Sequence, residues 1–265
     1  MHIEQKIDHP GEVNKARYQP QNPNIIATMC VDGRVLIFDR TKHSSFPKGI
    51  VSPQAELLGH KKEGFGLSWN PHEAGHLATG SEDKTVRLWY VPCHDILTVN
   101  LLPRDLTSLQ AHNTHVKASR VYTHHSSIVN DVQYHPLHKS LIGTVSDDLT
   151  LQILDVRQPE NNKSAVKGEG HTDAINALAF NPASEFILAT ASADKTIAIW
   201  DLRNLNSKLY SLEGHQDAVT SLAWHPFEQA ILGSGSYDRR VIFWDLSKVG
   251  EEQQPDDQED GPPEL

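Results

Sequence analysis

Short segments in which hydrophobic and polar residues alternate run through this chain, separated by turn residues. In one representative stretch, AINALAF (174–180) and TIAIWDL (196–202) alternate with a period of two, as strands with one buried face do. FILATAS (186–192) between them is a short apolar run, and KLYSLEGH (208–215) follows. The stretches NP, ADKT and RNLN supply turns between these segments. The pattern predicts four short antiparallel strands.

This four-stranded pattern is repeated along the chain. The segment GHTDAINALAFNP (170–182) returns 44 positions later as GHQDAVTSLAWHP (214–226). From the histidine of each copy, an aromatic residue follows at nine positions, proline at 11, serine or threonine at 19 and aspartate at 23. An aromatic residue or leucine stands at position 29. Five histidines begin such a unit: His9, His60, His125, His171 and His215.

A period near 44 residues, with GH and WD at fixed places, is typical of WD-repeat proteins. We therefore predict an all-β WD-repeat β-propeller over residues 1–248, with five visible blades. Residues 249–265 are acidic and contain Pro262 and Pro263, and we assign them to a separate loop or tail. The linker at 41–56 reads as an ordinary insertion between two blades.

The repeated polar residues have a structural explanation. In WD-repeat proteins the histidine, hydroxyl, aspartate and tryptophan form a hydrogen-bonded chain, and the aspartate lies in a tight turn whose backbone geometry it tolerates. Phe38 and Leu154 replace the tryptophan in two units, where we expect a weaker polar network. Three units are complete: His60, Thr79, Asp83 and Trp89; His171, Thr190, Asp194 and Trp200; His215, Ser234, Asp238 and Trp244.

The same residue types could indicate catalysis or metal binding, and we favour neither. A serine–histidine–aspartate triad is needed once, whereas this set recurs at one spacing. Zinc is the other possibility, because His112, His115, His124 and His125 lie close together in the sequence. Closed structural zinc sites usually include thiolates, and neither Cys30 nor Cys93 is near them. We expect no catalytic residue, no metal and no cofactor.

Composition limits the partners and the compartment. The formal net charge of −10 disfavours nucleic acid and favours basic protein partners. Two cysteines give no disulfide framework, which suggests a reducing compartment. The start of the sequence, MHIEQKIDHP, does not have the pattern of a signal peptide, and no apolar run is long enough to span a bilayer. We expect no membrane partner.

Several segments resemble the retinoblastoma-binding, MSI-type histone chaperones, and most closely the fungal members. The segments of this chain that carry the resemblance are residues 9–28, 57–71, 184–205 and 237–265. The resemblance implies a non-catalytic histone-binding subunit of a chromatin complex in the nucleus and cytoplasm. It points most closely to a type B histone acetyltransferase, in which a separate catalytic subunit acetylates the histone that this subunit holds. Other chromatin complexes remain possible partners.

The resemblance also implies two histone-binding surfaces. One is the rim beside the central channel, where the family takes an extended histone tail: Glu12, Asn14, Glu63, Phe65, Asn130, Asp147 and Asn176. Asn130 replaces an acidic residue there, and Ala218 and Thr220 replace an acidic–aromatic pair. The affinity of this chain for the histone tail should therefore be lower than that of the animal relatives. The other surface is the acidic Pro-Pro loop, which helps to hold a basic histone helix: Glu251, Glu252, Asp256, Asp257, Glu259, Asp260 and Glu264.

This chain departs from the family pattern, which has seven blades and an N-terminal helix. We expect a fragment that lacks the helix and the last blade or blades, and that begins with an outer strand, HIEQKI (2–7). An open arc is favoured over closure as a five-bladed propeller, in which HIEQKI would complete blade five. Residues 90–120 have no strand alternation, and we expect an irregular, disordered or poorly packed insertion there.

Two other functions compete with histone binding. A generic WD-repeat scaffold, such as a ubiquitin-ligase substrate receptor, lacks the acidic Pro-Pro loop. A propeller enzyme would need converging carboxylates or metal ligands at the channel. The carboxylates that we place on the rim are Glu12, Glu63 and Asp147. Because the resemblance gives these carboxylates binding roles, we favour neither alternative.

Overall fold

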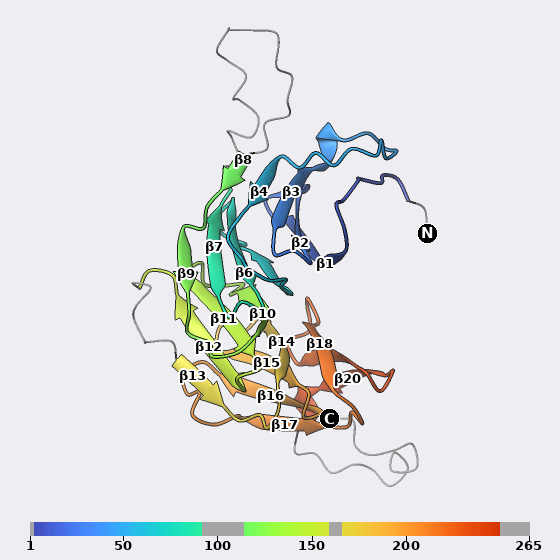
Figure 1. The fold of residues 1–265 in the computed structure, drawn as a ribbon. Helices are drawn as coiled ribbons and strands as arrows, with labels where there is room; N and C mark the ends of the chain where they lie inside the picture. The colour runs from blue at the N-terminus through green and yellow to red at the C-terminus, as the bar shows by residue number, and fades with distance from the viewer. Residues whose placement is uncertain (1–2, 92–113, 159–165, 250–265) are drawn as a thin grey trace, which may run out of the picture. The chain divides into compact units, whose positions relative to one another are not determined.

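The computed structural model describes residues 3–91, 114–158 and 166–249, and its regular structure is almost entirely β-strand (Figure 1). The helical elements in the described residues are two short 3-10 turns, η1 (Arg40–Lys42) and η2 (Leu246–Lys248). The strands form five sheets, here named A to E. The chain divides into two compact units, unit 1 (Met1–Thr123) and unit 2 (His124–Leu265). The all-β prediction is confirmed.

Unit 1 contains sheets A and B. Both are antiparallel meanders, apart from one parallel pair at the outer edge of sheet A. Sheet A has the order β1 (Val13–Gln19), β2 (Asn22–Cys30), β3 (Val35–Asp39), β4 (Ala55–Leu57) and β8 (Thr114–Val116). Sheet B has the order β5 (Gly66–Trp69), β6 (His76–Gly80), β7 (Val86–Tyr90) and β9 (Arg120–Tyr122).

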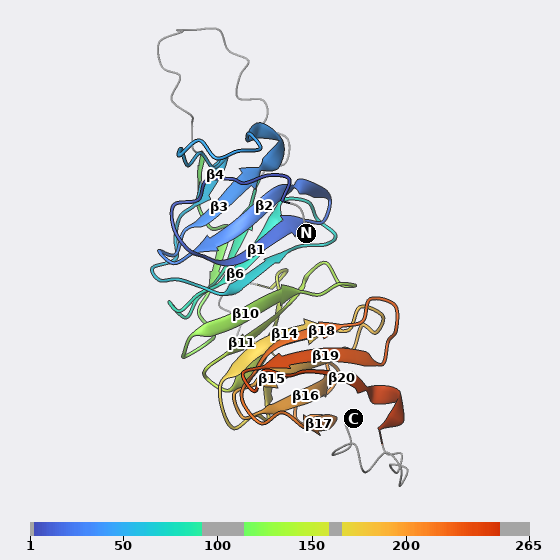
Figure 2. The same ribbon diagram turned by 90° about the vertical axis from the view of Figure 1, so that its right-hand side faces the viewer.

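Unit 2 contains sheets C, D and E, and the strands of sheet E lie side by side in chain order (Figure 2). Sheet C comprises β10 (Val129–Tyr134), β11 (Leu141–Ser146), β12 (Thr150–Asp155) and β13 (Val166–Glu169). Sheet D comprises β14 (Ile175–Phe180), β15 (Ile187–Ser192), β16 (Thr196–Asp201) and β17 (Tyr210–Glu213). Sheet E comprises β18 (Val219–Trp224), β19 (Ile231–Ser236) and β20 (Val241–Asp245) in the described residues.

Sheet D shows how the sequence pattern produces this fold. Its four strands coincide with the four segments expected from alternation and apolar runs, and they pair antiparallel without any other element between them. Both faces of β15 and β16 are buried, because neighbouring sheets of unit 2 cover them. Trp200 and Leu188 face each other across these two strands and are fully buried. The apolar burial in such layers is the main stabilising contribution.

The innermost strand of four sheets carries an irregularity at one position. The register shifts between Val129 and Asp131 in β10, so the residue between them has no partner on β11. The equivalent shift occurs at the start of β1, β14 and β18. A β-bulge of this kind redirects the side chain of the extra residue. The redirected residues are Asn14, Asn130, Asn176 and Thr220.

The turn between the second and third strands differs from our expectation. The residue that needs unusual backbone geometry is the one after the repeat aspartate, not the aspartate itself. Lys84, Leu149, Lys195 and Arg239 have φ of 67° to 73°, and Gly33 takes the same place in sheet A with φ of 85°. The aspartate is used instead as an acceptor, because its carboxylate receives N–H groups from the turn and from the histidine loop.

The expected strand HIEQKI is wrong for the residues that are described. Ile3 to Ile7 are not in any sheet. The amide of Gln5 donates to the carbonyls of Arg40 and His43, and Ile7 packs on the cluster around Phe38. In the described residues the Gln5 amide and the Lys6 N–H therefore bond to the loop that follows β3.

The expectation of an irregular insertion over residues 90–120 is also wrong in part. Residues 92–113 lie outside the described part of the chain. Tyr90 ends β7, β8 pairs with β4, and the Ser119 N–H donates to the Leu88 carbonyl at 2.7 Å just before β9. Val116 and Ala118 pack against the core of unit 1. The unpaired backbone groups of β4 and the apolar side chains order this segment despite its weak alternation.

Candidate functional site

The repeated polar side chains form continuous hydrogen-bonded chains, from aspartate to tryptophan, inside sheets B, D and E. In sheet D, His171 Nδ1 donates to Asp194 Oδ2 at 2.9 Å, and His171 Nε2 lies 2.8 Å from Thr190 Oγ1. The indole N–H of Trp200 donates to the same Oγ1 at 2.7 Å. The structure brings together the four residues of each complete unit in the same order.

The arrangement in sheet E has the hydrogen-bond order of a catalytic triad without its chemistry. Ser234 Oγ lies 2.7 Å from His215 Nε2, and His215 Nδ1 lies 2.8 Å from Asp238 Oδ2. However, Ser234 is buried, and its Oγ also accepts the indole N–H of Trp244 at 2.8 Å. A nucleophile must be accessible to a substrate, whereas Ser234 is 2% exposed and its oxygen is already bonded to both His215 and Trp244. These residues therefore stabilise the sheet.

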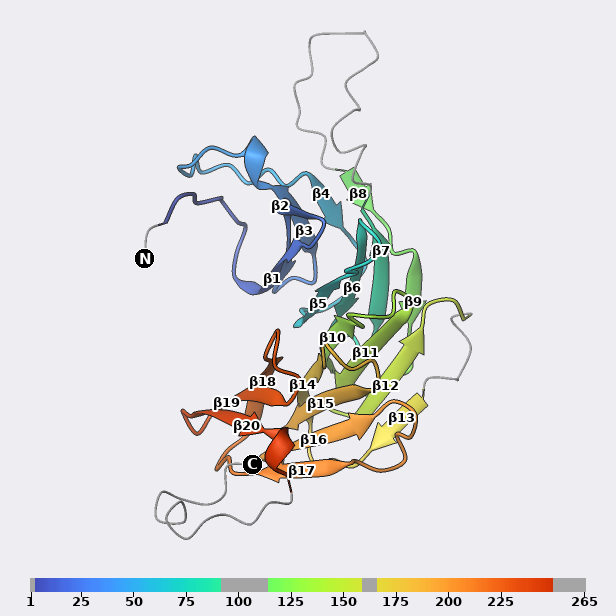
Figure 3. The same ribbon diagram turned by 180° about the vertical axis from the view of Figure 1, so that it is seen from behind.

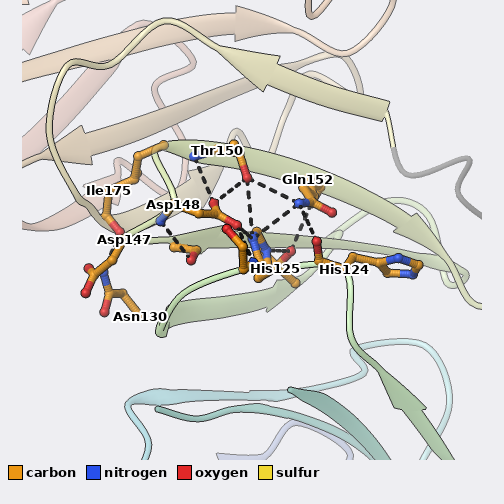
Figure 4. A network of polar contacts seen from close by, with 11 residues as sticks. His124, His125, Asn130, Asp147, Asp148, Thr150, Gln152 and Ile175 are labelled. Atoms are coloured by element: carbon orange, nitrogen blue, oxygen red, sulfur yellow. Dashed lines mark hydrogen bonds and ion pairs between the residues drawn. The ribbon is translucent and has the colours of Figure 1, made fainter. Parts of the chain in front are cut away.

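The two units without the tryptophan contain different networks. In sheet C, His125 keeps its contacts with Asp148 and Thr144, and the amide of Gln152 adds contacts to His125 Nδ1 and Thr150 Oγ1 (Figure 4). In sheet A the chain is broken. His9 Nδ1 contacts the Gly11 carbonyl, and Asp32 forms an ion pair with Arg34 instead.

Burial and hydrogen bonding shift the pKa values of these groups. Burial would raise the pKa of Asp194, but hydrogen bonds from Thr196, the Thr172 N–H and His171 outweigh it and lower that pKa to about 2. Burial lowers the pKa of His171 below 6.5, although its bond to Asp194 opposes the shift. The pKa of His60 is lowered for the same reason. Near neutral pH the folded protein therefore holds His60 and His171 neutral against ionised Asp83 and Asp194.

These shifts predict the stability of the protein in acid. A buried histidine with a lowered pKa binds fewer protons when folded, so the free energy of unfolding should fall as the pH drops below 6.5. A second loss should follow between pH 3.8 and about 2, where unfolded chains protonate Asp194 and folded chains do not. Urea denaturation from pH 8 to about pH 2 measures both losses. His72→Gln, which changes an exposed histidine, should leave the curve unchanged, and constant stability from pH 7 to pH 5 would contradict the prediction.

The rim residues of unit 1 are partly brought together. The bulge residue Asn14 donates through Nδ2 to Glu63 Oε2 at 2.9 Å and to the Gly64 carbonyl at 3.3 Å. This amide joins the innermost strand of sheet A to the segment that enters sheet B, and it fixes the Glu63 carboxylate. Phe65 follows and is 42% exposed, and Glu12 is exposed near the start of β1. Among the described residues, Glu63 Oε1 receives no hydrogen bond, so it can accept another donor.

The rim residues of unit 2 follow the same principle. Asn130 Nδ2 donates to Asp147 Oδ1 at 2.7 Å and to the Ile175 carbonyl at 2.9 Å (Figure 4). Asn176 Nδ2 donates to the Val219 carbonyl at 2.8 Å. Asn130 and Asn176 therefore hold the innermost strand of the next sheet, and Asn14 holds the segment that leads into it. Two of the asparagines also orient a half-buried carboxylate, which is preorganised to accept cationic or N–H donors.

Sequence reasoning missed a further set of rim positions. In sheets B to E, the residue 22 places after the repeat histidine donates its backbone N–H to the carbonyl of the residue three places after that histidine. Asp147 was selected at this position, but Glu82 and Tyr237 were not. Glu82 bonds to Glu63, and Tyr237, which is 72% exposed, bonds to Ala218. The constant offset, one residue before the repeat aspartate, was the signal that could have identified them.

Other expected sites are not tested by the described residues. The acidic loop from Glu251 to Glu264 and His112 lie outside them. Within the described ranges no three histidine, cysteine or carboxylate side chains are grouped as a metal site would require. No helix in the same ranges is long and apolar enough to cross a membrane. The polar geometry described here consists of structural chains and two oriented rim carboxylates.

Comparison with known proteins identifies close relatives. Residues 51–90, 116–155, 163–201 and 206–245 match the family described as WD domain, G-beta repeat. The chain is 73% identical over 264 residues to histone acetyltransferase type B subunit 2 of Aspergillus oryzae and to that of Neurospora crassa. It is 68% identical over 266 residues to that of Gibberella zeae. These alignments cover 99% of this chain but 56% to 58% of the relatives.

Proposed function

We propose that this chain, which belongs to the WD repeat family, is a non-catalytic histone-binding part of a type B histone acetyltransferase complex. The WD-repeat fold prediction is thereby confirmed, whereas the number of blades stays a prediction. The chain spans about 57% of the length of its A. oryzae relative, so partners and activity are proposed for the longer protein to which such a sequence corresponds. We propose the nucleus and cytoplasm as its location.

The observation that carries this proposal is the 73% identity, which extends over 99% of the chain. The rim geometry supports it. Glu63 and Asp147 are each held by an asparagine amide through one carboxylate oxygen, and no other described residue donates to the second oxygen. With a net charge of −10, the protein attracts basic segments over long range, and fixed carboxylates pair with lysine and arginine at short range.

The identity also separates this proposal from its alternatives. The curated relatives are named as subunits of an acetyltransferase, which disfavours a ubiquitin-ligase receptor. The buried hydroxyls of the repeated chains disfavour a hydrolase. We propose histones and the acetyltransferase catalytic subunit as partners, and other chromatin complexes remain further candidates.

Removing the rim charges should weaken the binding of histone tails. Glu63→Gln and Asp147→Asn keep the oxygen that accepts from Asn14 or Asn130, so they change charge and preserve geometry. Each should reduce affinity by about 1 kcal/mol, or about fivefold in Kd, through the loss of one ion pair. Fluorescence anisotropy with labelled N-terminal peptides of histones H3 and H4 measures the effect.

The control for this measurement is Glu228→Gln, which removes an exposed carboxylate away from the rim residues. It should leave Kd unchanged within error. Affinities that fall equally in all three variants would show a general charge effect and contradict rim binding. Mass spectrometry of the affinity-purified endogenous protein tests the complex itself, because histones and an acetyltransferase catalytic subunit should copurify with it.

A further inference from the structure

A small groove in unit 1, remote in sequence from the rim residues other than Glu12 and Asn14, has the properties of a docking site. Its walls are the N-terminal segment at 6–8 and the loop at 42–52. We name these two segments together the N-terminal clasp, and Figure 3 shows the course of their backbones. The groove between them has a volume of about 190 Å³. Small-molecule pockets usually have about 300–1,000 Å³, so this one suits a single large side chain.

The two walls are held together by hydrogen bonds. The Lys6 N–H donates to the Ser45 carbonyl at 3.1 Å. Asp8 Oδ2 accepts the N–H groups of Lys48 and Gly49 at 2.8 Å and 2.9 Å. The loop is therefore fixed by the segment it faces, and a ligand would meet a preformed shape and lose less conformational entropy on binding.

The base of the clasp is anchored in sheet A. His43 contacts the Phe38 ring, with 5.7 Å between ring centroids, and lies 3.3 Å from Gln54 Oε1. Ile7 packs on the buried cluster that contains Leu36 and Phe38. These contacts bury apolar groups only at the base of the clasp. The largest apolar side chains of the outer part of the loop stay exposed to water.

Apolar side chains at the groove are unusually exposed. Phe46 is 80% exposed and Ile50 is 69% exposed, and both line the groove. A large apolar side chain can gain roughly 1.5–3 kcal/mol from full burial, and exposed apolar groups that line a groove mark sites of interaction. Hydrogen bonds fix the backbone of the loop, and these two side chains remain exposed on it.

The charges around these apolar groups are mostly positive. Lys6, Lys42 and Lys48 line the groove, and its carboxylate is Asp8, one oxygen of which already accepts two backbone N–H groups. Within the described residues, no carboxylate forms an ion pair with Lys6 or Lys48. A basic, apolar groove on a protein of net charge −10 contrasts with the rest of the surface.

We infer that the N-terminal clasp binds an acidic peptide segment of a partner protein, which inserts one large apolar side chain between Phe46 and Ile50 and places carboxylates against Lys6 and Lys48. The lysines select carboxylates, and the apolar side chains supply buried area. A two-fold contact with a second copy would bring lysines against lysines, which disfavours self-association through this face. The site goes beyond the proposed histone binding, because histones would present basic segments to it.

The test uses the full chain and a fluorescein-labelled peptide, EDFEELFDE, in anisotropy titrations. Saturable binding is expected, weakened at least about tenfold by Lys6→Glu with Lys48→Glu and at least about fivefold by Phe46→Ser. The matched controls are Lys61→Glu with Lys62→Glu, which make the same charge change on another exposed loop, and Phe227→Ser, at a phenylalanine that is 86% exposed. These should leave Kd unchanged.

A charge swap keeps the test valid if a variant is destabilised. The chain with Lys6→Glu and Lys48→Glu should bind the basic peptide KRFKKLFKK more tightly than the unchanged chain does. The inference is overturned if EDFEELFDE does not bind, if the control variants lose as much affinity, or if a single-stranded oligonucleotide binds the groove in its place. Histone-peptide binding by the same variants should be unaffected, which separates failure of this site from failure of the proposed function.

Discussion

Replacing Thr190 with valine should destabilise the protein by about 3 kcal/mol, since two buried groups lose their partner at once. Thr190 Oγ1 lies 2.8 Å from His171 Nε2 and accepts the Trp200 N–H at 2.7 Å. Thr190 and Trp200 have no exposed surface, so water cannot replace the lost bonds. Valine has nearly the same shape, so the loss is one of hydrogen bonding and leaves the packing almost unchanged. Urea denaturation measures the change.

Sheet C provides a matched control in the same unit. Thr144 is equally buried and lies 2.8 Å from His125 Nε2, but Leu154 stands where the tryptophan would donate. Thr144→Val should therefore cost about half as much, because one buried nitrogen loses its hydroxyl and no indole does. Equal losses in the two variants would show that the indole bond adds no stability, and would contradict a stabilising role for the tryptophan in the repeated chain.

Gly64→Ala should destabilise unit 1 by about 3 kcal/mol. A Cβ on Gly64 would collide with the Gly80 carbonyl oxygen and with Met29 Cε, and would lie 3.0 Å from Ser81 Cα. Two of these three atoms belong to the backbone, one at the end of β6 and one in the residue that follows it. Backbone atoms cannot move aside as the end of a flexible side chain could. The Gly64 carbonyl also accepts from Asn14, so the strain would reach the rim.

Hydrogen–deuterium exchange should locate this loss in β1 to β7. The control is Gly11→Ala, because no atom lies within 4 Å of a Cβ built at Gly11. That change should alter stability by less than about 1 kcal/mol, toward stabilisation, since alanine restricts the unfolded chain. Faster exchange in unit 2 rather than unit 1 after Gly64→Ala would contradict the proposed collision.

Much of the fold and part of the candidate site followed from the sequence. The recurrence of histidine, hydroxyl and aspartate at fixed offsets predicted contacts that depend on antiparallel pairing inside one sheet. Thr190 faces Ala198 and Leu188 faces Trp200 across β15 and β16, so local register alone brings the hydroxyl and the indole together. The rim positions were found because they lie at constant distances from the repeat histidine of each unit, and their part in histone binding stays a prediction.

The rest depended on contacts between segments that are far apart in the sequence, and no local pattern encodes these. Asn130 and Asn176 are predicted to contact a ligand, and their amide N–H groups also hold the next sheet, a contact that only the packing of sheets could decide. The N-terminal segment found its partners in the loop after β3, and residues 114–116 found theirs on β4. The sequence by itself determined the strands, their order and the hydrogen-bonded chain within a sheet, because these are matters of local spacing. The tertiary structure decided which polar groups stay free to bind, because each group first bonds with whichever neighbour folding brings to it.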